Sequence, residues 1–321
     1  MAVPLRTKVF WELYRRVERF PVMQQPPERV RRASDQRNRM LQLPLAWLLI
    51  GRTDPGVTAT DTVATLPDGT ALPLRIYRPR GATGPLPVVM NFHGGGWVSG
   101  NIRQSEWWAS SIAARSGAAV ISVEYRLAPE HAFPGPVEDC YAATLWAVEH
   151  AAELGLDVSK LAVMGDSAGG NIAAVVCLMS RDRGGPPIAL QVLIYPGVDF
   201  LSEFASKSEN ADAPILCKRD IDNAQRLYFH GSDGDCADPY ASPLRAKHHD
   251  LPAALVQTAQ HDPIRDDGAA YAEALRQAGV PVRYTNYVDA VHGYISLPAL
   301  VPAARQALAE AATAIRDAFA D

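Results

Sequence analysis

The stretch "VMGDSAGGNIA" (Val163–Ala173) decides the fold, because it sets one serine among glycines between an apolar run and a helical pattern. Gly165 to Gly169 fit the pattern G-x-S-x-G, in which a nucleophilic serine lies on a strained turn from strand to helix. In such a turn a side chain at either glycine would clash, and Ser167 is expected to take a positive φ. The alternative is a serine that only caps a helix. A nucleophile needs partners elsewhere in the chain and a cap does not, so the remaining sequence decides between them.

The composition indicates a large globular protein without a surface for nucleic acids. The chain has 321 residues, of which 48% are hydrophobic, enough for one large α/β domain or two smaller ones. Its formal net charge of −4 provides no basic patch for nucleic acids or anionic lipids. The four cysteines lie far apart and predict no disulfide framework. The N-terminal residues do not fit a signal peptide, and no apolar window fits a membrane span, so we expect a cytoplasmic protein.

Alternation of apolar runs with helical patterns predicts an α/β fold. Two strands are expected on either side of a turn at Asp68 and Gly69. Further strands are expected at residues 87–92, 118–125, 161–165, 189–195, 252–259 and 282–287. Helices are expected near residues 106–116, 136–150, 168–180, 266–278 and 299–319. This order predicts a mostly parallel sheet of about eight strands with helices on both faces and right-handed crossovers.

Two segments do not follow this alternation. Residues 1–50 contain an apolar helical face formed by Phe10, Trp11, Tyr14 and Val17, followed by the apolar run Leu41–Ile50. Residues 200–234 are polar, lack a clear strand and contain a helical pattern around 220–229. Long excursions from a compact sheet are often lids over a site. For the first segment, ordinary core packing is the alternative.

The stretch "NFHGGGWVSG" (Asn91–Gly100) places three consecutive glycines directly after a predicted strand. Glycines allow the backbone to approach a ligand closely, so their N–H groups can bind an oxyanion. A flexible turn is the alternative, and it is less favoured because a candidate nucleophile follows downstream. His93 is expected to orient this loop. Trp97 either lines a substrate pocket or packs under the loop.

A serine nucleophile needs a base and an acid, and the chain order for this fold class is serine, acid, histidine. His292 follows the last predicted strand, and Asp262 follows the strand before it. Asp266 and Asp267 are rivals for the acid, but acidic residues there also suit the first turn of a helix. The other histidines fit the role of base less well: His131, His150, His230, His248, His249 and His261.

Five blocks in this order resemble the hormone-sensitive-lipase-like (bacterial family IV) esterases of the α/β-hydrolase fold. They are "HGGGW" (93–97), "YRLAPEHAFP" (125–134), "GDSAGGN" (165–171), "DPIRDDG" (262–268) and "VHGY" (291–294). The resemblance implies Ser167 as nucleophile, His292 as base and Asp262 as acid. It implies oxyanion donors at the backbone N–H groups of Gly95, Gly96 and Ala168, with Gly94 shaping the loop.

The resemblance also implies a division of the chain. Residues 1–50 and 200–234 would form a cap, and residues 51–199 and 235–321 the catalytic domain. Tyr125, Arg126, Glu130, His131 and Asp166 are expected to hold the loops rather than react.

These features predict a carboxylesterase acting on short- to medium-chain esters through an acyl-enzyme, without a metal or cofactor. The substrate would be a small-molecule ester, and the family makes a homodimer plausible. An amidase or deacetylase on the same triad is one alternative. A non-catalytic ligand-binding homologue is another, and the presence of His292 argues against it.

Overall fold

The structure is a computed structural model, and it describes residues 47–66 and 68–320. It also describes isolated positions before them: 5, 8, 12, 26, 28–30, 32, 33, 36 and 39. The predicted apolar face of Phe10, Trp11, Tyr14 and Val17 lies outside the described residues. Of the apolar run Leu41–Ile50, the last four residues form the short helix α3 (Trp47–Ile50).

An eight-stranded sheet forms the centre of the molecule, in the order β1-β2-β4-β3-β5-β6-β7-β8. Its strands are β1 (Val57–Thr65), β2 (Ala71–Pro79), β3 (Leu86–Phe92), β4 (Ala119–Val123), β5 (Leu156–Asp166), β6 (Leu190–Ile194), β7 (Ala253–His261) and β8 (Val282–Val291). β1 and β2 form the predicted hairpin around Asp68 and Gly69, and β2 is antiparallel to β4. All other neighbouring strands are parallel. The predicted mostly parallel sheet is confirmed.

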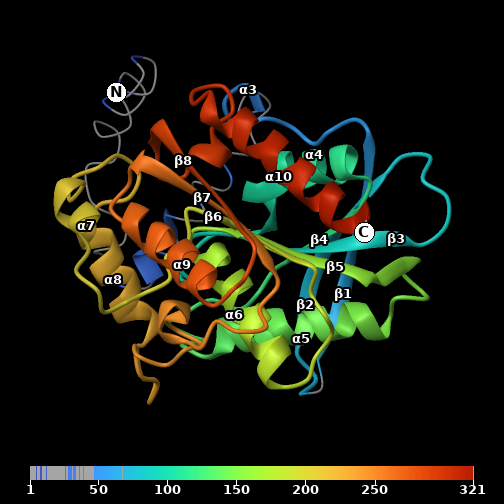
Figure 1. The fold of residues 1–321 in the computed structure, drawn as a ribbon, viewed down its shortest axis with the longest axis horizontal. Helices are drawn as coiled ribbons and strands as arrows, with labels where there is room; N and C mark the ends of the chain where they lie inside the picture. The colour runs from blue at the N-terminus through green and yellow to red at the C-terminus, as the bar shows by residue number, and fades with distance from the viewer. Residues whose placement is uncertain are drawn as a thin grey trace.

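Helices cover both faces of the sheet, as expected. They are α4 (Glu106–Ser116), α5 (Gly135–Glu149), α6 (Ala168–Asp182), α9 (Arg265–Gln277) and α10 (Ala303–Ala320). α4 and α10 share one apolar core with one face, while α5, α6 and α9 share the core of the other (Figure 1). β4 and β6 are buried along their whole length, which explains why they read as continuous apolar runs rather than alternating ones.

The parallel strands bring the predicted functional residues to one edge of the sheet. β3 leads into the glycine-rich loop, β5 into Ser167, β7 into Asp262 and β8 into His292. Because these strands run in the same direction, their carboxyl ends meet at the same edge, where ligands bind in open α/β sheets. The topology therefore gathers residues that are far apart in the sequence.

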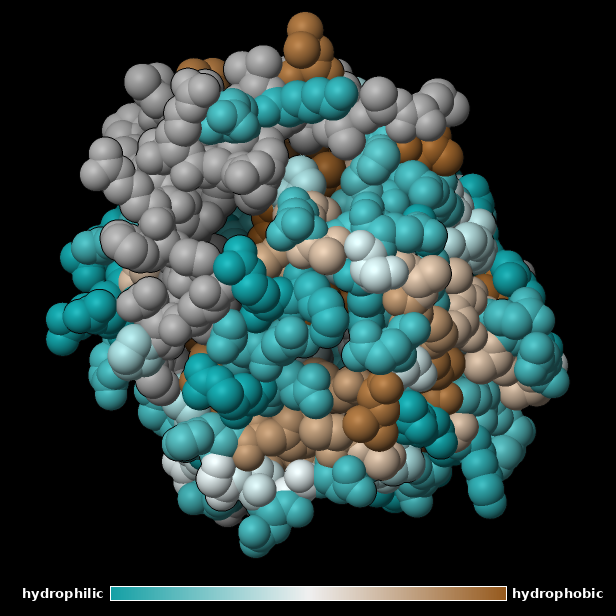
Figure 2. All heavy atoms as spheres, turned by 90° about the vertical axis from the view of Figure 1, so that its left-hand side faces the viewer, coloured by the Kyte–Doolittle hydropathy of each residue, from teal (hydrophilic) through white to brown (hydrophobic). Residues whose placement is uncertain are grey.

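Residues 200–234 leave the sheet after β6, and they contain α7 (Ala205–Glu209) and α8 (Lys218–Tyr228). These two helices lie together at one side of the sheet (Figure 1, left). The described surface on that side is mainly hydrophilic, with smaller apolar areas between (Figure 2). Within the described part of the chain, no helix has the length and apolar character needed to cross a membrane.

Candidate active site

Ser167 lies on a sharp turn between β5 and α6 and has φ 56° and ψ −120°. A positive φ is uncommon for a serine and is energetically unfavourable, so the surrounding structure must hold it. Two backbone bonds do so: the Ser167 N–H donates to Ile194 O at 2.9 Å, and the Asn171 N–H donates to Ser167 O at 3.1 Å. The side chain of Ser167 makes no cap bond to α6. The capping alternative therefore fails, and the hydroxyl is left for another partner.

The glycines beside this serine are required by close backbone contacts. A Cβ atom at Gly165 would lie 2.2 Å from Gly169 O, and one at Gly169 would lie 2.0 Å from Phe92 O. Both distances are far shorter than a carbon–oxygen contact allows. The two glycines thus let β5 and α6 approach each other and the end of β3.

Ser167, His292 and Asp262 form one hydrogen-bonded chain. His292 Nε2 lies 2.9 Å from Ser167 Oγ, and His292 Nδ1 lies 2.7 Å from Asp262 Oδ2. Because a carboxylate can only accept, Nδ1 carries the proton and Nε2 accepts from the serine hydroxyl. Asp262 is fully buried and His292 is 7% exposed. This is the arrangement in which an acid fixes the histidine tautomer and the histidine can remove the serine proton.

The rival acids at the start of α9 have other partners. The Oδ2 atom of Asp266 accepts from the Ser206 N–H at 2.9 Å, and its Oδ1 pairs with Arg265 at 2.7 Å. Asp267 is buried on α9 near Lys207, and burial raises its pKa well above the ordinary value. The Asp262 carboxylate is oriented within its own turn, where its Oδ1 accepts from the Ile264 N–H at 3.0 Å.

Gly94 and Asp166 join the glycine-rich loop to the turn that carries Ser167. The Gly94 N–H donates to Asp166 Oδ1 at 2.9 Å, so this N–H is already used. A Cβ atom at Gly94 would lie 2.6 Å from Asp166 Oδ2, which explains the glycine. Gly94 is therefore fitted to shape the loop, while Asp166 acts as the acceptor that orients it.

The next residues of the loop present free donors. Gly95 and Gly96 have φ of 125° and 62°, and within the described chain neither backbone N–H has a hydrogen-bond acceptor. Ala168 is the first residue of α6, where an N–H lacks an acceptor inside the helix. The three N–H groups expected from the sequence are thus available for a ligand oxygen, and their role as an oxyanion hole stays a prediction.

His93 fixes the start of the loop. Its Nδ1 lies 2.8 Å from Gly94 O, and its ring stacks on Tyr125 with centroids 4.2 Å apart. The Tyr125 hydroxyl donates to His93 O at 2.6 Å, and Gln104 Nε2 donates to Gly94 O at 2.9 Å. Burial lowers the pKa of His93 to about 4, so the ring is neutral near pH 7. These contacts match the expected orienting role of His93 and the bracing role of Tyr125.

Asp166 is the titratable group with a raised pKa beside the serine. Burial raises the pKa of Asp166 to about 6, against the opposing effect of the Gly94 N–H bond. Its Oδ2 lies 3.4 Å from the Tyr195 hydroxyl. The Tyr195 ring in turn contacts His292, with centroids 4.7 Å apart. Tyr195 was not expected from the sequence, because a tyrosine at the end of an apolar strand carries no signal of its own.

Trp97 packs against residues 200–234. It has φ 60° and is 6% exposed, and its ring stacks on Tyr228 at 4.6 Å and contacts Phe200 at 5.1 Å. Of the two alternatives for Trp97, these contacts favour packing. Its proposed contact with substrate stays a weak prediction.

Ile215 brings the same insertion to the histidine loop. It has φ 70°, which for a β-branched residue is an outlier. A Cβ atom on Gly293, the neighbour of His292, would lie 3.3 Å from Ile215 Cγ2, so the two residues are in contact. No pattern in the sequence indicates this contact, because it joins two loops through one exposed side chain.

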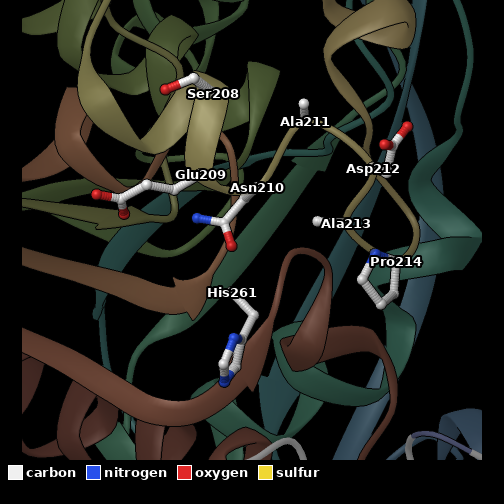
Figure 3. A pocket seen from close by; sticks show the side chains of 8 residues that line it. All are labelled: Ser208, Glu209, Asn210, Ala211, Asp212, Ala213, Pro214 and His261. Carbon is white, nitrogen blue, oxygen red and sulfur yellow. The ribbon is translucent and has the colours of Figure 1, made fainter.

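Three of the other histidines have side-chain partners away from the serine. His150 and His248 bond to the carbonyl oxygens of Trp146 and Pro243, and His249 pairs with Asp250. His261 lines a cavity together with residues 208–214 (Figure 3).

A protein-family model described as the alpha/beta hydrolase fold matches residues 89–296. Carboxylesterase NlhH of Mycobacterium tuberculosis is 45% identical over 253 residues, covering 78% of this chain and 79% of the relative. Ethyl acetate hydrolase of Pseudomonas putida is 33% identical over 267 residues, covering 81% and 83%.

Among solved structures, a hyperthermophilic esterase from the archaeon Pyrobaculum calidifontis superposes with a TM-score of 0.91. It is 35% identical to this chain, and the match covers 99% of both chains. The range matched by the family model, 89–296, contains all five sequence blocks, and the TM-score shows that the solved esterase has the same fold. The chain therefore belongs to the α/β-hydrolase fold family and, within it, to the hormone-sensitive-lipase-like esterases that its sequence resembles.

Proposed function

We propose that this protein hydrolyses small carboxylic esters, with Ser167 as nucleophile, His292 as base and Asp262 as acid. The observation that carries the proposal is the hydrogen-bonded chain from Ser167 Oγ through His292 to the buried Asp262. The names of the relatives, a carboxylesterase and an ethyl acetate hydrolase, support the same reaction class.

The geometry fits acyl transfer in two steps. The Ser167 oxygen attacks the ester carbonyl while His292 Nε2 takes the hydroxyl proton, and Asp262 stabilises the imidazolium. The carbonyl oxygen gains negative charge, which the N–H groups of Gly95, Gly96 and Ala168 would bind. His292 returns the proton to the leaving alcohol. A water molecule then attacks the acyl-enzyme by the same sequence and releases the acid.

Ser167→Ala tests the nucleophile. It should lower kcat on p-nitrophenyl butyrate by on the order of 10⁴-fold or more, with an unchanged thermal melt. Ser159→Ala is a matched control, because Ser159 is an exposed residue of the same strand whose hydroxyl contacts Asp157. Turnover that survives Ser167→Ala would reject the assignment.

A preference for short to medium acyl chains is part of the proposal. An aromatic cluster of Trp97, Phe200 and Tyr228 fills space next to the glycine-rich loop. The activity named for the Pseudomonas relative also points to a small ester. We expect p-nitrophenyl butyrate or hexanoate to be hydrolysed faster than long-chain emulsified substrates. Faster turnover of the emulsions would overturn the preference.

The alternatives of amide hydrolysis and of ligand binding without catalysis are tested together. An ester and an amide with the same acyl group separate esterase from amidase or deacetylase. Labelling of Ser167 by a fluorophosphonate distinguishes either enzyme, esterase or amidase, from a binding protein, since an inactive pocket should not react. The hydrogen bond between Ser167 and His292 favours labelling.

The division into cap and catalytic domain, the compartment and the oligomeric state are also proposals. We propose that residues 200–234, together with residues 1–50, cover the site, which the contacts of Trp97 and Ile215 support. A reducing compartment such as the cytoplasm is supported by the four cysteines, all of which are free. A homodimer is supported by β8, an edge strand of the sheet. Light scattering would distinguish 34.8 kDa from twice that mass.

A further inference from the structure

The short helix α7 at the start of the insertion contacts the loop that carries Asp262. It has five residues, Ala205–Glu209, which is too few for a helix to be stable by itself. Its residue Ser206 is fully buried although it is polar. A buried serine needs hydrogen-bond partners, and the partners of the Ser206 hydroxyl and N–H lie in the acid loop, residues 262–266.

Ser206 makes three bonds to that loop. Its hydroxyl donates to Pro263 O at 2.8 Å and accepts from the Asp266 N–H at 3.2 Å. Its own N–H donates to Asp266 Oδ2 at 2.9 Å. One side chain therefore bonds to two backbone groups of the turn that follows Asp262, the oxygen of Pro263 and the N–H of Asp266.

Two further contacts join the same segments. Asn210 Nδ2 donates to the backbone oxygen of Asp262 at 3.2 Å. Arg265 bridges Glu209 and Asp266, at 2.9 Å and 2.7 Å. The insertion thus bonds to the backbone of the acid loop at Asp262, Pro263 and Asp266.

The acid loop borders an open pocket on the side that faces the insertion. A cavity of about 290 Å³ lies between residues 208–214 and His261, the residue before Asp262. Figure 3 shows Asn210 and His261 on opposite sides of this space. An open pocket beside the loop leaves room for the loop to shift when its hydrogen bonds are lost.

We propose that Ser206 is a positioning residue for the catalytic acid, acting through Pro263 and Asp266 on the orientation of Asp262. The proposal rests on the proposed function, because it assigns to Ser206 the placement of a triad member. Among the described residues, Asp262 Oδ1 accepts its hydrogen bond from the turn that ends at Ile264, so a shift of this turn moves Oδ2 away from His292. A misplacement of about 1 Å lowers the rate by up to about 10²-fold.

Ser206→Ala is the test, and Ser208→Ala is its matched control. Ser208 lies on the same helix, is exposed, and donates its hydroxyl to Ala205 O within the helix. We expect Ser206→Ala to lower kcat by about 10- to 100-fold with KM changed less than about 2-fold. We also expect the acidic limb of the pH–rate profile to move to lower pH, because a poorly placed Asp262 stabilises the imidazolium less. Ser208→Ala should leave all three unchanged.

Neither Ser206→Ala nor Ser208→Ala changes a charge. A shift of the pH–rate profile would therefore report a change in the position of Asp262. The titratable and charged groups around the acid loop are Asp166 from β5, Asp199 from the segment after β6, Lys207 and Glu209 from α7, His261 from β7, Arg265, Asp266 and Asp267 from α9, and His292 after β8. All of them remain in both variants. A loss of thermal stability with unchanged kcat and an unchanged pH profile would overturn the proposal, since it would show a purely structural role.

A second variant covers failure of Ser206→Ala to fold. Asn210→Ala removes the bond to the Asp262 backbone at a half-buried position, and it should give a smaller loss of kcat with the same shift of the acidic limb. An unchanged kcat and limb in that variant would also overturn the proposal. Failure of the proposed function looks different: wild-type turnover would be absent or would survive Ser167→Ala.

Discussion

Gly169 shows how one missing side chain sets up the candidate site. The carbonyl of Phe92, at the end of a central strand, occupies the place where a Cβ atom would lie. The nucleophile turn and the glycine-rich loop are therefore in direct backbone contact. Neither can move without the other, so the hydroxyl of Ser167 and the candidate oxyanion donors keep one relative position.

Gly169→Ala should therefore lower both stability and activity. The added methyl group would force β3 and α6 apart at a cost of about 1–3 kcal/mol of unfolding free energy, and kcat should fall as well. Thermal melts and steady-state kinetics measure the two effects. Gly135→Ala, at the start of α5 where a Cβ atom meets only His131 at 3.4 Å, should be close to wild type. Unchanged stability and activity in Gly169→Ala would mean that the turn tolerates a larger distance between β3 and α6.

Asp166 makes the stability of the fold depend on pH. Its pKa of about 6 in the folded protein is above the ordinary 3.8, so the folded state holds this proton more tightly than the unfolded state. The resulting stabilisation is complete below pH about 3.8 and is lost as the pH rises through 6, and two pKa units correspond to about 3 kcal/mol.

Asp166→Asn has no proton to lose and keeps an oxygen that can accept the Gly94 N–H. Its unfolding free energy relative to wild type should rise between pH 4 and pH 7. Urea titrations at several pH values measure this difference. Asp317→Asn, at an exposed position of α10, is the control and should show no comparable rise. A difference that stays constant with pH would contradict the raised pKa of Asp166.

Helix α8 is attached to the glycine-rich loop through one aromatic stack. Tyr228, at its last turn, is fully buried against Trp97, and its hydroxyl has no hydrogen-bond partner among the described residues. The ring is therefore used for packing, while the hydroxyl is an unsatisfied polar group that destabilises the fold.

Two substitutions at Tyr228 should thus have opposite effects. Tyr228→Phe keeps the stack and removes the unpaired hydroxyl, so stability should be unchanged or higher by about 1 kcal/mol. Tyr228→Ala should lose about 3–5 kcal/mol and lower kcat, because Trp97 and the loop lose their support. Chemical denaturation and ester kinetics check both. A clear destabilisation by Tyr228→Phe would show that the hydroxyl has a partner.

The sequence was sufficient to predict the bounds of helices with a local periodicity. It was insufficient where pairing with a distant strand sets the bounds. Helix α4 was predicted at its observed bounds, since its periodicity is local. β5 was expected at 161–165 but begins at Leu156, because Leu86 and Pro87 pair with Leu156 and Asp157 before a register shift. That polar segment has no strand pattern of its own.

The insertion was the least predictable element. Its α8 was anticipated from a helical pattern, but α7 was not, because five residues are too short to show a period. The hydrogen-bonded chain of Ser167, His292 and Asp262 could be predicted, since each residue follows a recognisable strand in a known chain order. Ser206 and Ile215 could not, because their roles depend on which loops the fold places beside them.

Across the whole molecule, the residues of the proposed triad follow strands that differ in how easily they open locally. β5 lies in the middle of the sheet, whereas β8 is an edge strand that, among the described residues, pairs with β7 alone. Edge elements open locally at lower free energy than central ones. The hydroxyl of Ser167 thus depends on a base held by one of the less protected strands.

Activity should therefore be lost before the fold melts. We expect the midpoint of thermal inactivation, assayed at temperature, to lie a few degrees below the midpoint from circular dichroism. Hydrogen exchange should show faster exchange in β8 than in β5. Coincident midpoints with equal exchange would show that the sheet opens only as a whole.

The separation of 125 residues between Ser167 and His292 also has a consequence during synthesis. A nascent chain that has passed the glycine-rich loop and the serine still lacks its base. The hydroxyl on that chain is an ordinary alcohol and cannot attack the esters or acylating metabolites of the cell. Under the proposed mechanism, reactivity arises only when β8 joins the sheet and brings His292 to Ser167, so labelling by a phosphonate would mark finished molecules and leave truncated ones unlabelled.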